Sequence, residues 1–282
     1  MNSIFDKYIL SNGVEIPCIG FGTYKSKNGA ETTSSVLKAF ECGYRLIDTA
    51  ALYGNERSVG NAVRESGLSR QEVFVTSKVW NTRRGYDNTI KAFNLSLKSL
   101  KLDYMDMFLI HWPANSAQYD DPDSVNLDTW RALTDLYKEG LVKVIGVCNF
   151  LGHHLKPLLD CEIKPMVNQI EFHPGYMQKE VYDICMDNNI RVEGWSPLGR
   201  GEVLQNPVLL ELAAKYGCTT AQLCLRWCIQ HKVIPLPKSV TPERISSNTD
   251  VFFFSISDED MKQIDEIPFC GGSGHNPDTV DF

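Results

Sequence analysis

The chain has 282 residues, of which 43% are hydrophobic and 22% charged, and its formal net charge is −7. This composition is typical of a globular protein with a large core and argues against a disordered chain. An acidic chain without a basic block is poorly suited to nucleic acid or anionic membranes, so we expect neither partner. No apolar run approaches the roughly 18 residues that cross a bilayer, and the N-terminus lacks a signal-peptide pattern, which predicts a cytoplasmic location.

The nine cysteines are scattered along the chain and include no Cys-x-x-Cys pair. Disulfide frameworks and zinc sites usually show an even count or closely spaced ligands. We therefore expect reduced, mostly buried cysteines and no metal site.

In chain order, the first predicted element is a hairpin over residues 8–17 with its turn at Asn12-Gly13. Short β-rich apolar runs then alternate with helical patterns. Several of these runs are apolar on both faces, as the strands of a covered parallel sheet are. The predicted strands are residues 18–22, 44–49, 73–80, 105–112, 142–150, 166–173, 190–197 and 233–239.

The segments between these runs have helical periodicity, most clearly in residues 90–100, where the apolar side chains fall on one face. Two later segments begin with residues that resemble capping boxes. These pairs are Thr219 with Gln222, and Ser257 with Asp260.

Eight β–α units predict a single (β/α)8 TIM barrel domain over residues 1–282, with an irregular C-terminal tail at 270–282. The alternative is a doubly wound sheet of the dinucleotide-binding type, which has Gly-x-Gly-x-x-Gly after its first strand. The chain has Gly20 and Gly22 but Lys25 in place of the third glycine. The barrel is therefore favoured.

Four titratable side chains lie where predicted strands end, which is where barrel enzymes carry their chemistry. They are Asp48, Tyr53, Lys78 and His111. Lys78 interrupts a buried run, and an unpaired buried ammonium is costly, so we expect Asp48 on the neighbouring strand to be its partner.

This set of residues suits carbonyl reduction. A nearby Lys78 ammonium would lower the pKa of the Tyr53 phenol and let it donate a proton to a carbonyl oxygen. His111 could hydrogen-bond the same oxygen. Taken singly, each residue has a structural interpretation: a loop cap, a surface tyrosine, a solvated lysine or a core histidine. The four together favour a functional one.

At this point the chain resembles the aldo-keto reductases, in particular their shorter bacterial-type members. The similarity runs from about Tyr8 to the C-terminus and is most specific in residues 43–63, 95–113 and 233–248. It implies a barrel enzyme that reduces aldehydes and ketones with NADPH, commonly as a monomer. It also implies that Asp48, Tyr53, Lys78 and His111 are the catalytic residues.

The resemblance further implies a cofactor site at the ends of the later strands. Asn149 and Gln169 match residues that hold the nicotinamide amide, and Cys148 stands where serine is usual. Trp195 takes the place of the aromatic residue that stacks on the nicotinamide. Ser196 and Leu198 match positions near the pyrophosphate.

For the 2′-phosphate of NADP, the resemblance implies a segment that begins at Lys238. A lysine, an arginine fork and hydroxyl groups near a helix start suit a dianion, although a solvated helix start is the alternative interpretation. Asn248 matches an adenine-binding position, preceded here by Ser247. The implied phosphate-site residues are Lys238, Ser239, Val240, Thr241 and Arg244.

The implied substrate pocket is lined by the aromatic residues Tyr24, Trp80 and Trp112. The connection 199–206 and the tail after Ile267 are short compared with those of many members of this family. The resemblance therefore predicts a more open cofactor cleft and a less enclosed substrate site. Two other functions stay open: a non-catalytic NADPH-binding sensor, and a barrel lyase that forms a Schiff base at Lys78. The substrate is left open among sugars, diketo acids, small aldehydes and prostaglandin-type ketones.

Overall fold

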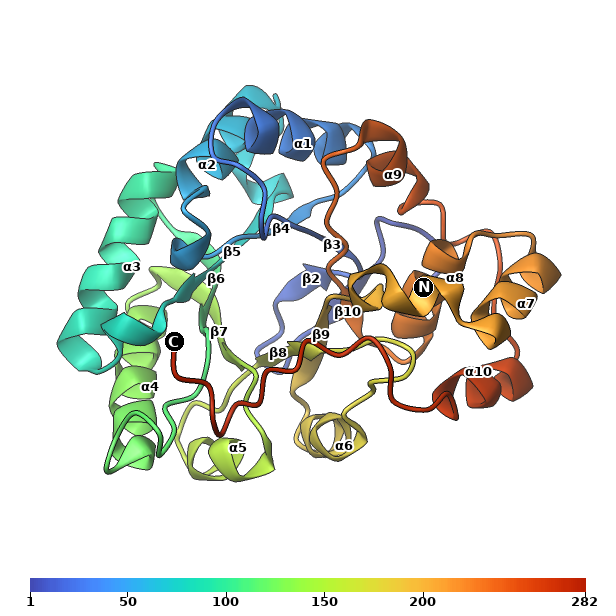
Figure 1. Ribbon diagram of the computed structural model, residues 1–282. Coiled ribbons are helices and arrows are strands. Elements are labelled where there is room, and N and C mark those ends of the chain that lie inside the picture. The colour runs from blue at the N-terminus through green and yellow to red at the C-terminus, as the bar shows by residue number, and fades with distance from the viewer.

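The computed structural model describes residues 1–282 and places eight parallel strands in one sheet, in chain order from β3 to β10. Viewed down its axis in Figure 1, the sheet curves into a barrel with the helices outside. Gly22 N donates to Pro237 O at 3.0 Å, which brings the first strand to the end of the last and nearly closes the ring. The strands are β3 (Gly20–Gly22), β4 (Leu46–Asp48), β5 (Phe74–Val79), β6 (Met105–Ile110), β7 (Val142–Cys148), β8 (Val167–Glu171), β9 (Arg191–Trp195) and β10 (Ile234–Pro235).

Each of these strands lies within the range that the sequence predicted, so the barrel prediction is confirmed. Every residue of β5 and β6 is buried, as expected for strands covered on one face by helices and on the other by the barrel interior. The doubly wound alternative is excluded by the strand order.

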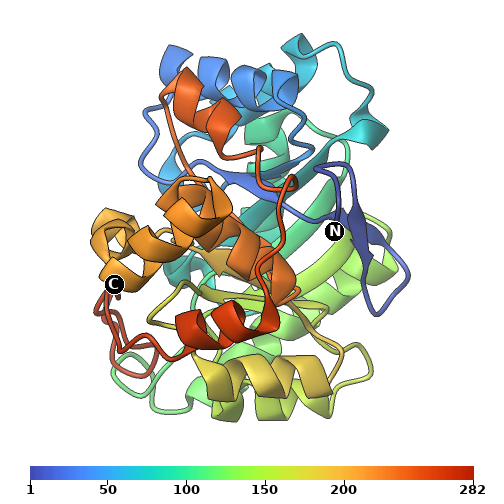
Figure 2. The ribbon, with the colours of Figure 1, turned by 90° about the vertical axis from the view of Figure 1, so that its right-hand side faces the viewer.

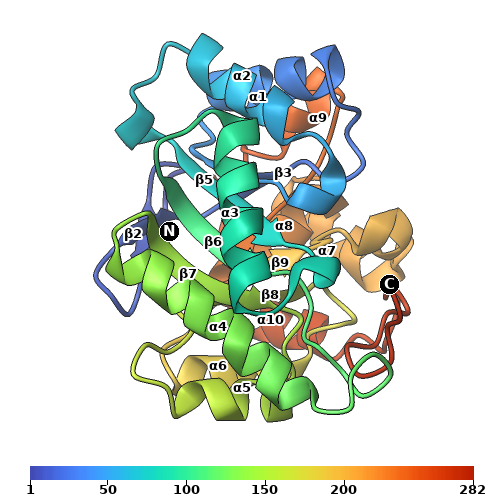
Figure 3. The same ribbon diagram turned by 90° about the vertical axis from the view of Figure 1, so that its left-hand side faces the viewer.

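The predicted hairpin is also present, as β1 (Lys7–Ile9) paired antiparallel with β2 (Glu15–Pro17). Gly13 has φ +83, a conformation that glycine adopts without strain. Figures 2 and 3 place this hairpin at the end of the barrel opposite the C-terminal tail. Tyr8 and Ile16 turn inward from it and are buried, so the hairpin covers that end.

The helices surround the barrel, and two of them begin as the sequence indicated. The capping box of Thr219 with Gln222 is confirmed at the start of α8. At the start of α10, Ser257 Oγ accepts a hydrogen bond from Asp260 N, which is one half of the second predicted capping box. The other half is absent, because the Asp260 carboxylate accepts from Lys215 and Tyr216 and not from Ser257 N. The helices are α1 (Ala30–Glu41), α2 (Glu56–Glu65), α3 (Tyr86–Leu100), α4 (Pro122–Lys138), α5 (Gly152–Leu159), α6 (Lys179–Asp187), α7 (Pro207–Tyr216), α8 (Thr220–Gln230), α9 (Pro242–Ser247) and α10 (Asp258–Asp265).

Three short 3₁₀ helices follow strands, namely η1 (Ala51–Tyr53) after β4, η3 (Asn81–Arg83) after β5 and η4 (Gly199–Gln205) after β9. A fourth, η2 (Arg70–Glu72), lies between α2 and β5. None of the helices combines the length and the apolar character that a bilayer span requires.

Residues 270–282 form neither helix nor strand, yet they are docked. The tail runs across the barrel mouth from α10 toward the ends of β6 and β7 (Figure 1). Ser273 N and Oγ donate to the Glu171 carboxylate, and Asn115 Nδ2 donates to the carbonyls of Pro277 and Val280. This packing differs from the open cleft that the short tail predicted.

Candidate active site

The four strand-end residues meet at one end of the barrel. Asp48 is the last residue of β4, Lys78 lies near the end of β5, and His111 directly follows β6. Tyr53 is the last residue of η1, the 3₁₀ turn after β4. Because β4, β5 and β6 are adjacent and parallel, their carboxyl ends bring these side chains together.

Lys78 is the centre of this group and has no exposed surface. Its Nζ lies 2.6 Å and 2.7 Å from the two oxygens of Asp48, 3.0 Å from Thr49 O and 3.4 Å from Tyr53 Oη. The predicted pairing of Lys78 with Asp48 is confirmed. Burial alone would lower the pKa of Lys78, but Asp48 and Tyr53 raise it above its ordinary value, so Lys78 stays a cation.

The predicted lowering of the Tyr53 pKa is wrong for the protein alone. Removal of the hydroxyl from water raises the pKa of Tyr53, and the Lys78 ammonium offsets only part of that rise. The Asp48 carboxylate raises this pKa further. The phenol is therefore protonated at neutral pH, which is the form that a proton donor needs, and Lys78 makes it a stronger acid than burial alone would allow.

His111 completes the group as a neutral ring. Burial, and secondarily the Lys78 charge, hold the pKa of His111 well below its usual range. Its ring centroid lies 5.7 Å from that of Tyr53 and 5.1 Å from that of Trp80, in edge-on contacts. Its Nδ1 is buried without a protein partner. His111 can therefore supply a neutral hydrogen-bonding group beside the phenol.

A layer of amides and carboxyls lies next to this group. Gln169 Nε2 donates to Asp48 Oδ2 at 2.9 Å and to Glu193 Oε2 at 2.8 Å. Asn149 Nδ2 donates to His111 O, and its Oδ1 accepts from Trp195 Nε1 at 2.8 Å. The structure thus joins Gln169, Asn149 and Trp195 to the strand-end residues, while their predicted contacts with the nicotinamide stay a prediction.

Two residues of this layer have unusual backbones. Asn149 has φ +62 and Ser196 has φ +49, in the left-handed region that non-glycine residues seldom adopt. Asn149 directly follows β7 and Ser196 directly follows β9, on either side of β8, which carries Gln169. Such conformations concentrate at ligand sites, where the surroundings hold them. Leu198 lies half-buried two residues beyond Ser196.

Cys148 is buried at the end of β7 and its thiol makes no hydrogen bond. Burial raises its pKa well above the ordinary value, so it is an uncharged thiol. The weak S–H donor contributes packing here rather than a strong polar contact.

The implied phosphate site lies apart from this layer, between β10 and α9. Lys238, Val240 and Arg244 are exposed, and neither Lys238 nor Arg244 forms an ion pair within the protein. Ser239 Oγ accepts from Thr241 N at 3.0 Å and shapes the turn. Asn248 is buried at the end of α9. Because α9 has only six residues, the two free cations are the main attraction for an anion.

Four aromatic side chains form a wall beside the four strand-end residues, and the sequence predicted three of them. Tyr24 is exposed, Trp80 is half-buried and Trp112 is buried. Phe282, the last residue, stacks on Trp80 with centroids 5.7 Å apart and packs edge-on against Trp112. Asn81 Nδ2 and Gln118 Nε2 donate to Phe282 O. Nothing in the local sequence links residue 282 to residue 80, so only the fold reveals this contact.

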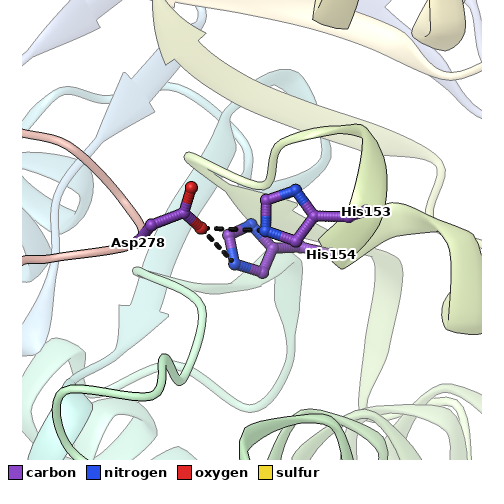
Figure 4. Close-up of side chains that lie close together, drawn as sticks. All are labelled: His153, His154 and Asp278. Carbon is purple, nitrogen blue, oxygen red and sulfur yellow. Dashed lines mark hydrogen bonds and ion pairs between the residues drawn. The ribbon is translucent and has the colours of Figure 1, made fainter.

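One His-His-Asp cluster fastens the tail to α5. His153 Nε2 and His154 Nε2 lie 2.8 Å and 3.2 Å from Asp278 Oδ1 (Figure 4). His154 Nδ1 accepts from Leu151 N at 3.2 Å, so the single proton of the neutral ring sits on Nε2 and points to Asp278. A metal ion at Nε2 would require the proton on Nδ1, against the Leu151 N–H. The cluster therefore suits a hydrogen-bonded clasp better than a metal site.

The comparisons with known proteins agree with this geometry. Residues 18–268 match the model of the Aldo/keto reductase family. The chain is 50% identical to a glyoxal reductase of Bacillus subtilis over 99% of both chains. It is 45% identical to a 9,11-endoperoxide prostaglandin H2 reductase of Trypanosoma cruzi, over 99% of this chain and 97% of that protein.

Solved structures show the same fold. An aldo-keto reductase from a Medee basin deep-sea metagenome superposes with a TM-score of 0.92 at 43% identity, over 98% of this chain and all of that one. A variant of Gox0644, solved in complex with NADPH, gives 0.90 at 37% identity, over 98% of this chain and 99% of that one. The chain belongs to the aldo/keto reductase family, whose members are NADP-dependent oxidoreductases.

Proposed function

We propose that this protein reduces short aldehydes, of the α-oxoaldehyde class, to alcohols with NADPH, and that Tyr53 donates the proton. The observation that carries this proposal is the contact of Lys78 Nζ with both Asp48 and Tyr53 Oη, at 2.6 Å and 3.4 Å. A buried ammonium next to a phenol stabilises the phenolate that remains after proton donation, so this contact suits general acid catalysis.

The side chains divide the work between them. Tyr53 gives its proton to the carbonyl oxygen, and Lys78 stabilises the phenolate that remains. Asp48 holds Lys78 charged and in place, while His111 orients the oxygen with a neutral hydrogen bond. Bound NADPH supplies the hydride that reduces the carbonyl carbon.

The residues at the mouth fit that cofactor. Gln169 Oε1 accepts no hydrogen bond from the protein, which leaves it free for the carboxamide of a nicotinamide. Trp195 offers a flat face for the nicotinamide and hydrogen-bonds Asn149. Cys148 ends β7, Ser196 and Leu198 follow β9, and all three would border the bound cofactor. Lys238 and Arg244 carry two positive charges that no protein carboxylate neutralises, as a 2′-phosphate requires. Ser239, Val240 and Thr241 lie between them in the chain, and Asn248, buried at the end of α9, would contact the adenine.

The aromatic wall supports a small substrate. Phe282 packs against Trp80 and Trp112, and Trp80 packs against His111. We infer from these contacts that the tail narrows the space available to a substrate next to Tyr53. A substrate with one or two carbons beyond the reacting carbonyl fits this arrangement better than a bulky ketone. The similarity to a glyoxal reductase points the same way.

The Schiff-base alternative conflicts with the state of Lys78. A lysine nucleophile must be an uncharged amine, whereas this ammonium contacts two carboxylate oxygens and a carbonyl. A non-catalytic sensor would not require the four strand-end residues Asp48, Tyr53, Lys78 and His111 to be brought together as they are. Neither is favoured.

We also propose that the protein acts as a cytoplasmic monomer. All the site residues come from one chain, and the net charge of −7 disfavours anionic membranes. Light scattering after size exclusion would test the oligomeric state, and a dimer mass would contradict it.

The decisive assay is NADPH oxidation against a carbonyl panel, run in parallel with NADH. We expect the highest kcat/KM for α-oxoaldehydes and a strong preference for NADPH. Bulky ketones as the best substrates would overturn the substrate class, and NADPH binding without turnover across the panel would overturn the enzymatic role.

A further inference from the structure

Glu193 is a buried carboxyl beside the active site to which the mechanism assigns no role. It lies on β9 with no exposed surface and pairs in register with Gln169 on β8. Glu193 Oε2 accepts one hydrogen bond, from Gln169 Nε2 at 2.8 Å. Its Oε1 is buried and has no partner. A carboxylate so poorly solvated would be very costly.

The charges around Glu193 do not balance if it is ionised. The charged or titratable groups that face it are Asp48 from β4, Lys78 from β5 and the Cys148 thiol from β7. Lys78 contacts both oxygens of Asp48 and makes no hydrogen bond to Glu193. One ammonium is thus paired with one carboxylate, and a second buried carboxylate has no counter-ion. When two carboxyls share one cation, the unpaired one keeps its proton.

The pKa of Glu193 agrees with this balance. Burial raises it to about 8, and the negative charge of Asp48 adds to the rise. Glu193 is therefore mostly protonated at neutral pH.

The position of Glu193 also restricts Gln169. One amide hydrogen of Gln169 goes to Asp48 and the other to Glu193, so both donors are used within the protein. If the amide flipped, its oxygen would face the Asp48 carboxylate, which has no proton to donate. Only Oε1 is left for a ligand, and it can only accept. A primary carboxamide that donates an N–H is the complementary group.

We propose that Glu193 is a positioning residue of the active site, which fixes the Gln169 amide so that its oxygen alone meets the cofactor carboxamide, and which must be uncharged for full activity. At alkaline pH its ionisation adds a negative charge near Lys78, the ammonium that stabilises the Tyr53 phenolate. The added charge weakens that stabilisation, so Tyr53 becomes a weaker acid and reduction slows. This inference rests on the proposed function.

Two kinds of variant separate the parts of the proposal. Glu193→Gln keeps an acceptor for Gln169 but cannot ionise. An apolar variant, Glu193→Leu, removes the acceptor, and Glu193→Met takes the place of Glu193→Leu if the leucine variant fails to fold. The measurements are NADPH affinity, from cofactor fluorescence, and kcat for the best aldehyde between pH 6 and about 9.5, a range that spans the ordinary and raised values.

We expect wild-type kcat to fall on an alkaline limb near pH 8, and Glu193→Gln to lose that limb while its NADPH Kd stays within about twofold. Glu193→Leu or Glu193→Met should weaken NADPH binding about tenfold, the usual effect of one lost positioning hydrogen bond, with little change in aldehyde KM. A limb that persists in Glu193→Gln overturns the protonation claim. Unchanged NADPH affinity in the apolar variant overturns the positioning claim.

A direct titration distinguishes failure of this inference from failure of the proposed function. Carboxyl ¹³C NMR of the wild type, with Glu193 assigned by the signal missing in Glu193→Gln, reports the proton without any turnover. If the Glu193 resonance titrates near 8 but the protein has no reductase activity, Glu193 does hold the buried proton and the proposed function is wrong. If the resonance titrates near 4.5 and the protein is an active reductase, the proposed function stands and only the role of Glu193 is wrong.

Discussion

Phe282 and Trp80 stack with their ring planes only 11° apart and their centroids separated by 5.7 Å. Trp80 follows β5, the third of the eight barrel strands, whereas Phe282 lies in the tail after α10, and the contact exists because the tail crosses the mouth. The Phe282 side chain thereby becomes part of the aromatic wall, whose Trp80 packs against His111 beside Tyr53.

Phe282→Ala is expected to relax the substrate preference. The loss of this ring leaves Trp80 uncovered, so KM for short aldehydes should rise about three- to tenfold while bulkier aldehydes gain relative to them. Steady-state kinetics over an aldehyde series would measure the change. Phe253→Ala is the matched control, because Phe253 is also an exposed phenylalanine but has no contact with the wall. An unaltered substrate profile in Phe282→Ala would remove Phe282 from the pocket.

Asp278→Ala is expected to loosen the tail, because Asp278 accepts from both His153 and His154. Limited proteolysis should cut within residues 270–282 faster, and KM for aldehydes should shift in the direction seen for Phe282→Ala. Asp281→Ala is the control, since Asp281 makes no hydrogen bond or ion pair. Equal cleavage rates for the two variants would show that the clasp does not hold the tail.

Tyr53→Phe is expected to remove the proton donor, together with its hydrogen bond from Lys78 Nζ, while the ring stays in place. The aldehyde reduction rate should fall by about 10²–10⁴-fold, the usual contribution of a general acid, while NADPH affinity stays close to that of the wild type. Tyr24→Phe, which changes the neighbouring ring 5.0 Å away, should keep most of the activity. Turnover of Tyr53→Phe within tenfold of the wild type would refute the assigned role.

Gly60→Ala is expected to destabilise the fold by about 1–3 kcal/mol through overpacking. Gly60 lies on the buried face of α2 where the helix meets the C-terminal end of α3, and an added Cβ would clash with the backbone of Leu100. Urea unfolding would measure the loss. Arg57→Ala, on the exposed face of α2, should change stability by less than about 0.5 kcal/mol.

Glu193→Gln is expected to change how stability depends on pH. The folded protein binds the Glu193 proton more tightly than the unfolded chain, because burial raises its pKa from 4.5 to about 8. The stability that this proton contributes is complete below pH 4.5 and is lost as the pH rises through 8. The unfolding free energy of the wild type should therefore fall relative to Glu193→Gln, by about 1.4 kcal/mol per pH unit within that window. Parallel urea titrations at several pH values would measure the difference, and a constant difference would contradict it.

Local pattern was sufficient for the strands and for the pairing of Lys78 with Asp48. Runs apolar on both faces require a covered parallel sheet, and a lysine within such a run requires a buried partner from the next strand. The same reasoning, applied to the acidic residue in the run 190–197, would have singled out Glu193. It was missed because one buried carboxyl has no obvious chemistry until its neighbours are known.

Three features came only from the tertiary structure. The pKa of Tyr53 depends on the balance between burial and charge, and burial outweighs Lys78 because the hydroxyl is withdrawn from water. The placement of Phe282 and the His153–His154–Asp278 clasp depend on where the tail lies, which no periodicity encodes.

By itself, the amino-acid sequence determined the order of the elements, the parallel barrel and the identity of the four strand-end residues, because hydrophobic periodicity and strand ends are local properties. Only the tertiary structure decided which protons the buried groups hold and which distant segment covers the site. Those depend on desolvation and on contacts between residues far apart in the chain, and both arise only when the chain has folded.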